Sequence, residues 1–165
     1  MSGPRFQRCD PAQVTELMSW FTDAEALRTW GGPDFRFPYT AATFREDTKV
    51  DSIDSFALIA ESGSVAAFGQ CYLRVGRCHF GRVGVSPRRR SQGLGTRLLR
   101  EMAAWGRDEF GPRELSLFVN RSNGDARRLY LRLGFREVPY PEAMPPGMDA
   151  HYMVADATAL ALLHP

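Results

Sequence analysis

The arginine- and glycine-rich run from Arg88 to Thr96 carries the residue types that bind phosphate groups. It reads Arg-Arg-Arg-Ser-Gln-Gly-Leu-Gly-Thr and lies between a predicted strand and a predicted helix. Gly93 and Gly95 have no Cβ, so the backbone can approach a ligand closely there. The first N–H groups of a helix lack intrahelical partners and attract anions, and arginine forks match phosphate oxygens. The spacing predicts an anion cradle, although the P-loop ending and a third dinucleotide-type glycine are both absent.

A second pattern follows in the segment 123–135, which reads Asn123-x-x-Ala126-x-x-Leu129-Tyr130-x-x-Leu133-Gly134-Phe135. Together with Arg90-x-x-Gly93-x-Gly95, this segment resembles the two signature motifs of the GNAT family of acyl-CoA-dependent N-acetyltransferases. The first is similar to the family's Arg/Gln-x-x-Gly-x-Gly/Ala pyrophosphate loop, and the second to its Asn-x-x-Ala-x-x-Leu-Tyr-x-x-x-Gly-Phe segment. The resemblance is specific from about Phe56 to Phe135. Ser91 departs from the family pattern, because many relatives carry glycine at this position. The serine predicts a slightly stiffer loop.

The resemblance implies acetyl-CoA as co-substrate, an amine as acceptor, and no metal. A backbone N–H at Gly84 or Val85 would stabilise the oxyanion, and the hydroxyl of Tyr130 would protonate the coenzyme A sulfur as the catalytic residue. Arg90 would help to hold the pyrophosphate, and Asn123 would contact the cofactor near the pantetheine. The implied cofactor-binding set comprises Val83, Gly84, Val85, Arg90, Ser91, Gln92, Gly93, Leu94, Gly95, Thr96, Asn123 and Tyr130.

Several of these residues also have a purely structural interpretation. Tyr130 lies in an apolar helical stripe and would be a core tyrosine without the motif. Asn123 is also a good helix cap, and Gly134 is most simply a helix terminator. Arg88 and Arg89 fit a solvated turn as well as they fit phosphate contacts. Gly93 and Gly95 have the weakest structural explanation, because two glycines opening a helix cost stability.

The residue that would deprotonate the acceptor is not identified by the sequence. A primary amine with a pKa of about 10 is protonated at neutral pH, so its direct attack on a thioester in a ternary complex requires loss of a proton. Many relatives use a carboxylate on the strand before the cradle, but the segment 78–85 contains no acid. A water chain is one alternative, and the side-chain candidates are Glu61, His79, Glu137, Asp149 and His151.

Hydrophobic periodicity predicts the elements that position these residues. A first helix is expected from Pro11, with Val14, Leu17, Met18 and Phe21 as its core stripe. A second is expected from a Thr22-x-x-Glu25 capping box to Trp30. Further helices are expected over 40–49, 94–110 and 123–133, with a short one after Asp156. Strands are expected over 56–60, 65–74, 77–85, 115–119, 135–138 and 150–155. The order predicts an α/β fold of the GNAT type, with a mixed, mostly antiparallel sheet flanked by helices. One parallel crossover lies at the cofactor site, where the resemblance implies that two strands splay apart and where Gly81 and Gly84 fit a bulge.

Composition is that of an ordinary globular protein. The 165 residues predict a single domain, with 44% hydrophobic and 24% charged residues. A net charge of +2 gives no nucleic-acid footprint. No signal peptide or membrane span is found in the sequence, and three cysteines favour reduced thiols in a cytoplasmic protein. If Val75-Gly76 forms a hairpin turn, Cys71 lies opposite Phe80 and does not pair with Cys78. A monomer and a homodimer are equally compatible with the sequence.

The acceptor's identity stays open. The aromatic residues Trp20, Trp30, Phe35, Phe37 and Tyr39 could line a pocket or pack the helical flank, and the proline-rich segment from Pro139 to Met148 could cover the acceptor site or form a stiff surface loop. Two other functions remain as alternatives. One is a non-catalytic acyl-CoA-binding regulatory module, which the missing strand carboxylate favours. The other is nucleic-acid binding through the arginines at 88–90, 121, 127, 128 and 132, which the near-neutral total charge disfavours.

Overall fold

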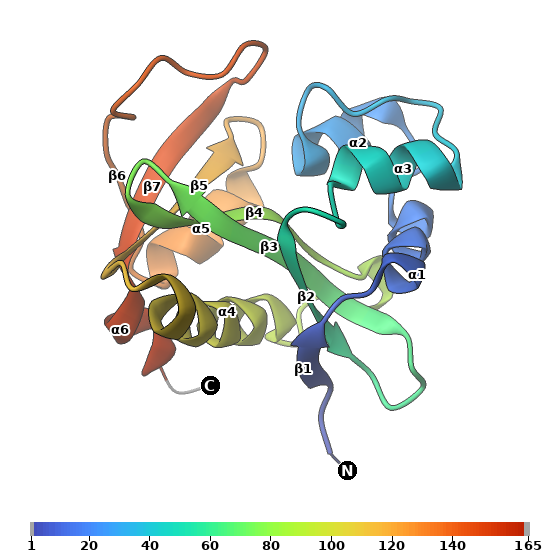
Figure 1. Ribbon diagram of the computed structural model, residues 1–165, viewed down its shortest axis with the longest axis horizontal. Helices are drawn as coiled ribbons and strands as arrows, with labels where there is room; N and C mark the ends of the chain where they lie inside the picture. Colours follow the sequence, from blue (N-terminus) through green and yellow to red (C-terminus); the bar gives the residue numbers. More distant parts are fainter. Residues whose placement is uncertain (1, 164–165) are drawn as a thin grey trace.

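A seven-stranded sheet in the order β1-β2-β3-β4-β5-β7-β6 forms the centre of the protein. It is seen in a computed structural model that describes residues 2–163 (Figure 1). All neighbouring strands are antiparallel except β4 and β5, which are parallel and joined by a helical crossover. This confirms the predicted fold class. The strands are β1 (Arg5–Arg8), β2 (Asp54–Ile59), β3 (Val65–Arg74), β4 (Arg77–Val85), β5 (Glu114–Asn120), β6 (Arg136–Glu137) and β7 (Ala150–Asp156).

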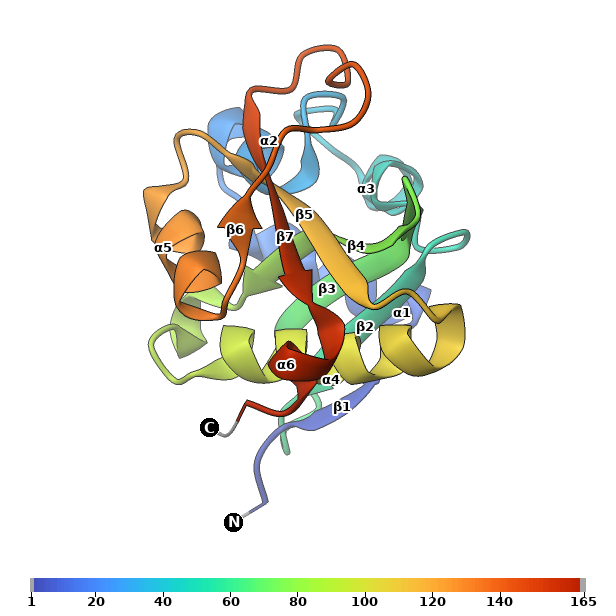
Figure 2. The ribbon, with the colours of Figure 1, turned by 90° about the vertical axis from the view of Figure 1, so that its left-hand side faces the viewer.

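Helices cover both faces of the sheet. They are α1 (Pro11–Val14), the 3-10 helix η1 (Thr15–Trp20), α2 (Ala24–Gly31), α3 (Ala41–Thr48), the 3-10 turn η2 (Pro87–Arg89), α4 (Leu94–Phe110), α5 (Gly124–Arg132) and α6 (Ala157–Ala161). The long helix α4 crosses one face with α6 beside it, and α1, α2 and α3 lie together on the other side (Figures 1 and 2). In β2, Phe56 and Leu58 join the core under α4, whereas Ala57 and Ile59 join the core under α1 to α3. Burial on both faces explains the unbroken apolar run of this strand.

The parallel pair β4 and β5 separates partway along its length. Cys78, His79 and Phe80 pair with Leu115 to Leu117, and no residue of β4 beyond Phe80 pairs with β5. On the opposite edge of β4, Phe68 faces Gly84 and Gln70 faces Gly81, so Gly69 alone faces two residues of a bulge. Arg82, within this bulge, has a φ of 49°. The bulge increases the local bend of β4 and turns it away from β5, which confirms the bulge predicted between the two glycines.

The N-terminal region differs from the sequence prediction in three ways. An additional edge strand, β1, pairs with β2, and its Arg8 forms an ion pair with Asp54. The first helix is regular only to Val14 and continues as the 3-10 helix η1. The second helix begins one residue later than predicted, because the side chain of Asp23, not of Thr22, accepts the N–H of Ala26. A carboxylate at this position also interacts favourably with the helix dipole.

The cysteine prediction holds for the hairpin of β3 and β4. Cys71 lies opposite Phe80 and Leu73 opposite Cys78, and all three cysteines of the chain are buried and free. Within residues 2–163, no helix has the length and apolar character that a membrane crossing requires.

Candidate active site

A cavity of about 930 Å³ opens where β4 and β5 separate. Its walls come from α2, β4, the β4–α4 loop, the start of α4, the end of β5 and α5. Of the twelve residues predicted to bind the cofactor, only Gln92 is not part of these walls. The other eleven line the cavity: Val83, Gly84, Val85, Arg90, Ser91, Gly93, Leu94, Gly95, Thr96, Asn123 and Tyr130. The fold thus brings the two sequence motifs together around one space.

The uncapped N-terminus of α4 lines this cavity. Gly93 is its N-cap residue, with a φ of 73°, and no side chain caps the helix. A Cβ built on Gly93 would meet no atom within 4 Å, so this residue faces open space. Arg89 and Arg90 line the cavity beside it, and neither forms an ion pair within residues 2–163. Ser91 also adopts a left-handed conformation, with a φ of 62°, which L-residues favour little. Uncapped N–H groups next to free guanidinium charge suit a pyrophosphate.

The bulged part of β4 is held in place by Trp30 from α2. The indole N–H of Trp30 donates to the carbonyl of Arg82 at 2.8 Å. A Cβ on Gly84 would lie 3.0 Å from the indole nitrogen, so a glycine is needed for this close approach. Trp30 is itself stacked on Phe21, with 4.6 Å between ring centroids. The backbone of residues 83–85 therefore faces the cavity from a braced position.

Tyr130 is buried at the inner wall of the cavity. Only 7% of the residue is exposed, and its ring contacts the edge of Phe135 with centroids 5.7 Å apart. Burial raises the pKa of Tyr130 to about 12, so the hydroxyl keeps its proton at neutral pH. That hydroxyl makes no hydrogen bond to another residue in the described part of the chain. Tyr130 is consequently a core residue that also lines the cavity.

Asn123 lines the same cavity and caps α5. Its Oδ1 accepts the backbone N–H of Ala126 at 3.3 Å. The structural interpretation of this residue is therefore correct, and its position in the cavity wall leaves its amide group available for a ligand. Gly134, with a φ of 96°, follows the last turn of α5 and ends it as predicted.

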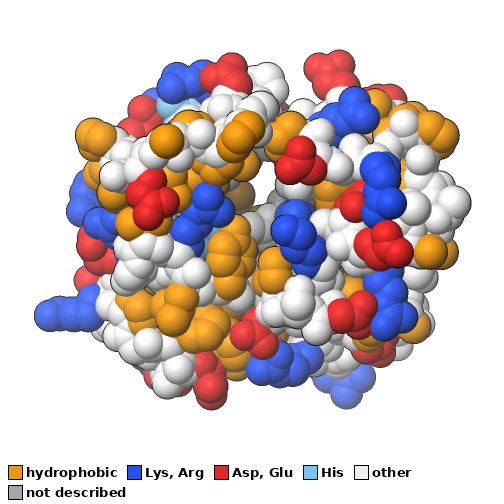
Figure 3. All heavy atoms as spheres, turned by 45° about the horizontal axis from the view of Figure 1, so that its top comes forward, with side chains coloured by type: hydrophobic (Ala, Val, Ile, Leu, Met, Phe, Trp, Pro, Cys, Tyr) orange, Lys and Arg blue, Asp and Glu red, His pale blue; other side chains and the backbone are white. Residues whose placement is uncertain are grey.

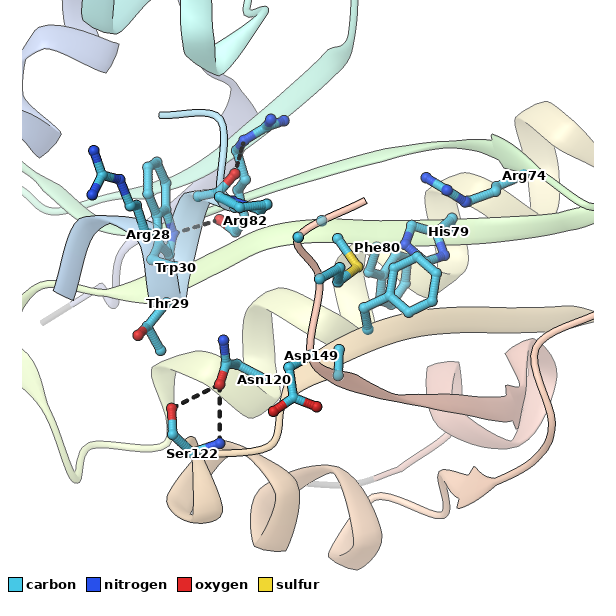
Figure 4. Close-up of a pocket in the computed structure, with 18 of the residues that line it drawn as sticks. Arg28, Thr29, Trp30, Arg74, His79, Phe80, Arg82, Asn120, Ser122 and Asp149 are labelled. Atoms are coloured by element: carbon cyan, nitrogen blue, oxygen red, sulfur yellow. Dashed lines mark hydrogen bonds between the residues drawn. The ribbon is translucent and has the colours of Figure 1, made fainter. Parts of the chain in front are cut away.

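A second cavity of about 390 Å³ adjoins the first (Figure 4). The two cavities share walls formed by Glu25, Thr29, Trp30, Phe80, Arg82, Phe118, Asn120 and Ser122. Figure 3 shows a hollow in this face of the molecule, with Lys and Arg side chains on its flanks. Because the two cavities have these residues in common, they lie side by side.

The aromatic residues of the N-terminal region divide between pocket and packing. Trp20 and Trp30 line the larger cavity. Phe35 is buried in the core under α1 to α3, and Phe37 and Tyr39 pack against that core. In the proline-rich segment between β6 and β7, the last two residues, Gly147 and Met148, line the smaller cavity, whereas residues 139–146 line neither cavity.

The five candidate bases lie in different surroundings. Glu61, at the β2–β3 turn, accepts a hydrogen bond from Ser2 and lines neither cavity. Glu137 also lies outside both cavities, and the Arg127 guanidinium holds the pKa of that carboxyl below its usual range. His151 is 3.4 Å from Glu137 and lines neither cavity. Asp149 and His79 do line the smaller cavity.

His79 is unsuited to act as a base. It is 2% exposed, and its Nδ1 lies 2.9 Å from the hydroxyl of Ser116. Burial, assisted by the nearby charge of Arg74, lowers the pKa of His79 to about 3. A group with this pKa is neutral at pH 7, and it is too weakly basic to hold a proton taken from an amine.

Glu25 and Arg74 are cavity residues that the sequence prediction missed. Glu25 lines both cavities, and Arg74 lines the smaller one. Glu25 was interpreted only as part of a helix cap, and Arg74 only as the end of a strand. No local pattern distinguishes either residue, because Glu25 lies on α2 and Arg74 ends β3, and only the tertiary structure brings both to one cavity.

The basic surface of α5 is largely neutralised by ion pairs. Arg121 contacts Asp149 at 2.9 Å and Arg127 contacts Glu137 at 2.5 Å, while Arg128 pairs with an aspartate of the same helix. This pairing weakens the interpretation of these arginines as a nucleic-acid contact surface.

Residues 17–135 match the model of the acetyltransferase (GNAT) family. The chain therefore belongs to the GNAT family of acetyltransferases, which makes it an enzyme of the acyltransferase class.

Solved structures share the fold over nearly the whole chain. The aminoglycoside acetyltransferase AAC(6')-Ib, solved with paromomycin and acetyl-CoA, is 18% identical with a TM-score of 0.75, and 99% of each chain is covered. Spermidine N-acetyltransferase from Vibrio cholerae, solved with CoA and spermine, is 14% identical with a TM-score of 0.71 over 97% of this chain and 99% of that one. A GNAT acetyltransferase from Bacillus anthracis is 11% identical with a TM-score of 0.73, covering 95% and 96%.

Proposed function

We propose that this protein transfers the acetyl group of acetyl-CoA to a primary amine of a small molecule or peptide, by direct attack in a ternary complex. The observation that carries this proposal is the pair of adjoining cavities. One has an uncapped helix N-terminus for an anion and a buried tyrosine, and the other offers space for a second substrate. Such an arrangement lets two substrates meet without a covalent enzyme intermediate.

The cofactor would lie in the larger cavity. The N–H groups at the start of α4, from Leu94 to Thr96, would hold the pyrophosphate with Arg90 beside them. The unpaired edge of β4 from Val83 to Val85 offers backbone groups to an extended arm. Bound acetyl-CoA would supply the thioester that the amine attacks. Solved GNAT structures with acetyl-CoA or CoA support this choice of co-substrate.

Two groups of this chain would stabilise the reaction. A backbone N–H at Gly84 or Val85, braced through Trp30, would donate to the oxyanion that develops on the carbonyl oxygen. The protonated hydroxyl of Tyr130 would donate to the departing thiolate. No single base is assigned, because the two carboxylates that line the smaller cavity, Glu25 and Asp149, are both exposed.

The test is calorimetric titration with acetyl-CoA, followed by a thiol-release assay with amino acids, small amines, polyamines, aminoglycosides and peptides. Binding together with release of CoA on addition of an amine would support the enzyme. Binding without release across the whole panel would favour an acyl-CoA-binding regulatory module. No binding by folded protein would overturn the proposal.

A further inference from the structure

Arg74 is held in a defined orientation at one end of the smaller cavity. Its Nε donates to the hydroxyl of Tyr140 at 2.9 Å, and its Nη1 donates to the hydroxyl of Tyr72 at 3.4 Å. The guanidinium also lies over the ring of Phe118, 5.0 Å from the centroid, and over that of Tyr140 at 5.6 Å. Figure 4 shows it beside His79, at the end of the cavity away from Thr29 and Trp30. Aromatic contacts and hydroxyl acceptors thus fix the plane of the guanidinium before any ligand arrives.

This guanidinium has no negative partner. No carboxylate lies within 4.0 Å of Arg74 in residues 2–163, although Arg77, on the other side of the hairpin turn, pairs with Glu114 at 3.1 Å. Tyr72 and Tyr140 use two of the five N–H donors, so three remain. A half-buried cation with free, coplanar donors at a cavity wall is suited to bind a carboxylate through two parallel hydrogen bonds.

Charge changes along the cavity. Glu25 lies in the wall that the two cavities share and forms no ion pair within the described residues, whereas Arg74 lines only the smaller cavity. Arg28 and Arg82 line the smaller cavity as well, but Arg28 donates to the carbonyl of Phe35, and Arg82 donates to the carbonyl of Gly31 and to Gln70. An ammonium group is therefore directed to Glu25 at the shared wall, and a carboxylate on the same molecule to Arg74. The remaining carboxylate of this cavity, Asp149, is 2.9 Å from Arg121, so the cavity lacks the excess of negative charge that would attract a polyamine.

We infer that the acceptor is an amino carboxylate, a small amine whose carboxylate binds to Arg74 while its amino group faces Glu25 and the thioester. The inference rests on the proposed acetyl transfer and specifies its substrate class. A volume of about 390 Å³ suits a molecule of amino-acid size. The reaction then forms an amide bond at the amine nitrogen and releases CoA as its thiol.

The test compares amines that differ only in the negative charge. L-leucine with L-leucinamide, and L-phenylalanine with 2-phenylethylamine, form matched pairs, and spermidine serves as a polycation. Turnover is measured as thiol release at saturating acetyl-CoA. We expect a higher kcat/KM for the acid of each pair. Intrinsic reactivity alone would favour leucinamide over leucine, because the amine of leucinamide has the lower pKa and is less protonated. A preference for leucine would therefore run against intrinsic reactivity.

The variant Arg74→Met is expected to lower kcat/KM for the acids by about 10- to 100-fold, mainly through KM, because a hydrogen-bonded charge pair is lost. Its values for the amide and the decarboxylated amine should change less than about twofold, since neither uses that pair. Arg74→Lys keeps the charge without the planar fork and should retain part of the preference. Arg113→Met, which removes an exposed arginine outside both cavities, is the control. Thermal unfolding and the acetyl-CoA Kd of each variant report on folding.

The outcomes separate this inference from the proposed function. Equal losses for acids and amides in Arg74→Met would assign Arg74 a purely structural role and overturn the inference. The inference would also be overturned if the native protein preferred spermidine or leucinamide to the acids. It would be overturned as well if protein that binds acetyl-CoA acetylated none of the acids. If acetyl-CoA itself does not bind, the proposed acetyl transfer fails instead.

Discussion

The indole N–H of Trp30 donates to the carbonyl oxygen of Arg82 at 2.8 Å, joining α2 to the bulge of β4. Together with the hydrogen bond from Nε of Arg82 to the carbonyl of Gly31 at 3.2 Å, it connects the helical flank to the strand segment that faces the larger cavity. It also places the indole against Gly84, where a Cβ would be 3.0 Å from the ring nitrogen. The position of the segment 83–85 is therefore determined by a residue more than fifty positions earlier in the chain.

Replacing Trp30 by phenylalanine should loosen this connection. The carbonyl of Arg82 loses its donor, so we expect a decrease of about 1–3 kcal/mol in the free energy of unfolding. The oxyanion donor becomes less well positioned, so kcat should fall by more than the acetyl-CoA Kd changes. Urea unfolding and steady-state kinetics measure both effects. Trp105→Phe, at a half-buried position of α4 outside both cavities, is the control for loss of an indole; an equal fall in kcat there would contradict a positioning role.

Gly93→Val should abolish acetyl-CoA binding. The substitution places a branched side chain in the open space that Gly93 faces and in a left-handed conformation that it does not tolerate. Gly111 ends the same helix with a φ of 87° and also has no neighbour within 4 Å of a built Cβ, so Gly111→Val introduces similar backbone strain away from the cavity. Calorimetry should show binding only in Gly111→Val. Comparable affinity in both variants would remove the cradle from the proposal.

Tyr130→Phe should lower kcat by at least about tenfold, because a positioned proton donor contributes on the order of 100-fold or more and water replaces part of it. The acetyl-CoA Kd should stay within about twofold, since the ring is retained and only the hydroxyl is lost. Tyr152→Phe removes another buried hydroxyl from outside both cavities and serves as the control. An unchanged kcat from pH 6 to pH 9 would exclude Tyr130 as the acid.

His79 should make the protein less stable in acid. Its folded-state pKa of about 3 lies below the unfolded value of about 6.5, so the unfolded chain binds more protons between these values. Its contribution to stability is present above pH 6.5 and is lost as the pH falls toward 3. The slope approaches about 1.4 kcal/mol per pH unit within this window. Urea unfolding from pH 7 to pH 4.5 should show a shallower loss for His79→Gln than for the native protein; parallel curves would contradict the prediction.

The strands and helices nearest the cofactor cavity could be predicted from the sequence because their signals are local. The bounds of β3, β4 and α4 agree with the predicted 65–74, 77–85 and 94–110. The hairpin turn at Val75-Gly76 separates the two strands, and glycines with positive φ at 76, 93 and 111 mark where they turn and where the helix begins and ends. The edge strand β1 was not predicted from the sequence, because arginines at both of its ends hide the apolar pattern. Of its residues, only Phe6 packs against the core under α4.

Residues of the proposed cofactor side could be named from the sequence, whereas the charged residues of the proposed acceptor side could not. Backbone N–H groups and glycines build the cofactor side, and their function depends on conformations that short motifs encode. The acceptor side depends on Glu25 and Arg74, 49 positions apart, whose surroundings consist of side chains from α2, β3, β5 and the β6–β7 loop. The sequence by itself thus determined the family and the order of most elements, and it located the loop that we propose as an anion cradle. Only the tertiary structure decided which charges face one cavity, because ion pairing and burial depend on residues brought together from distant parts of the chain.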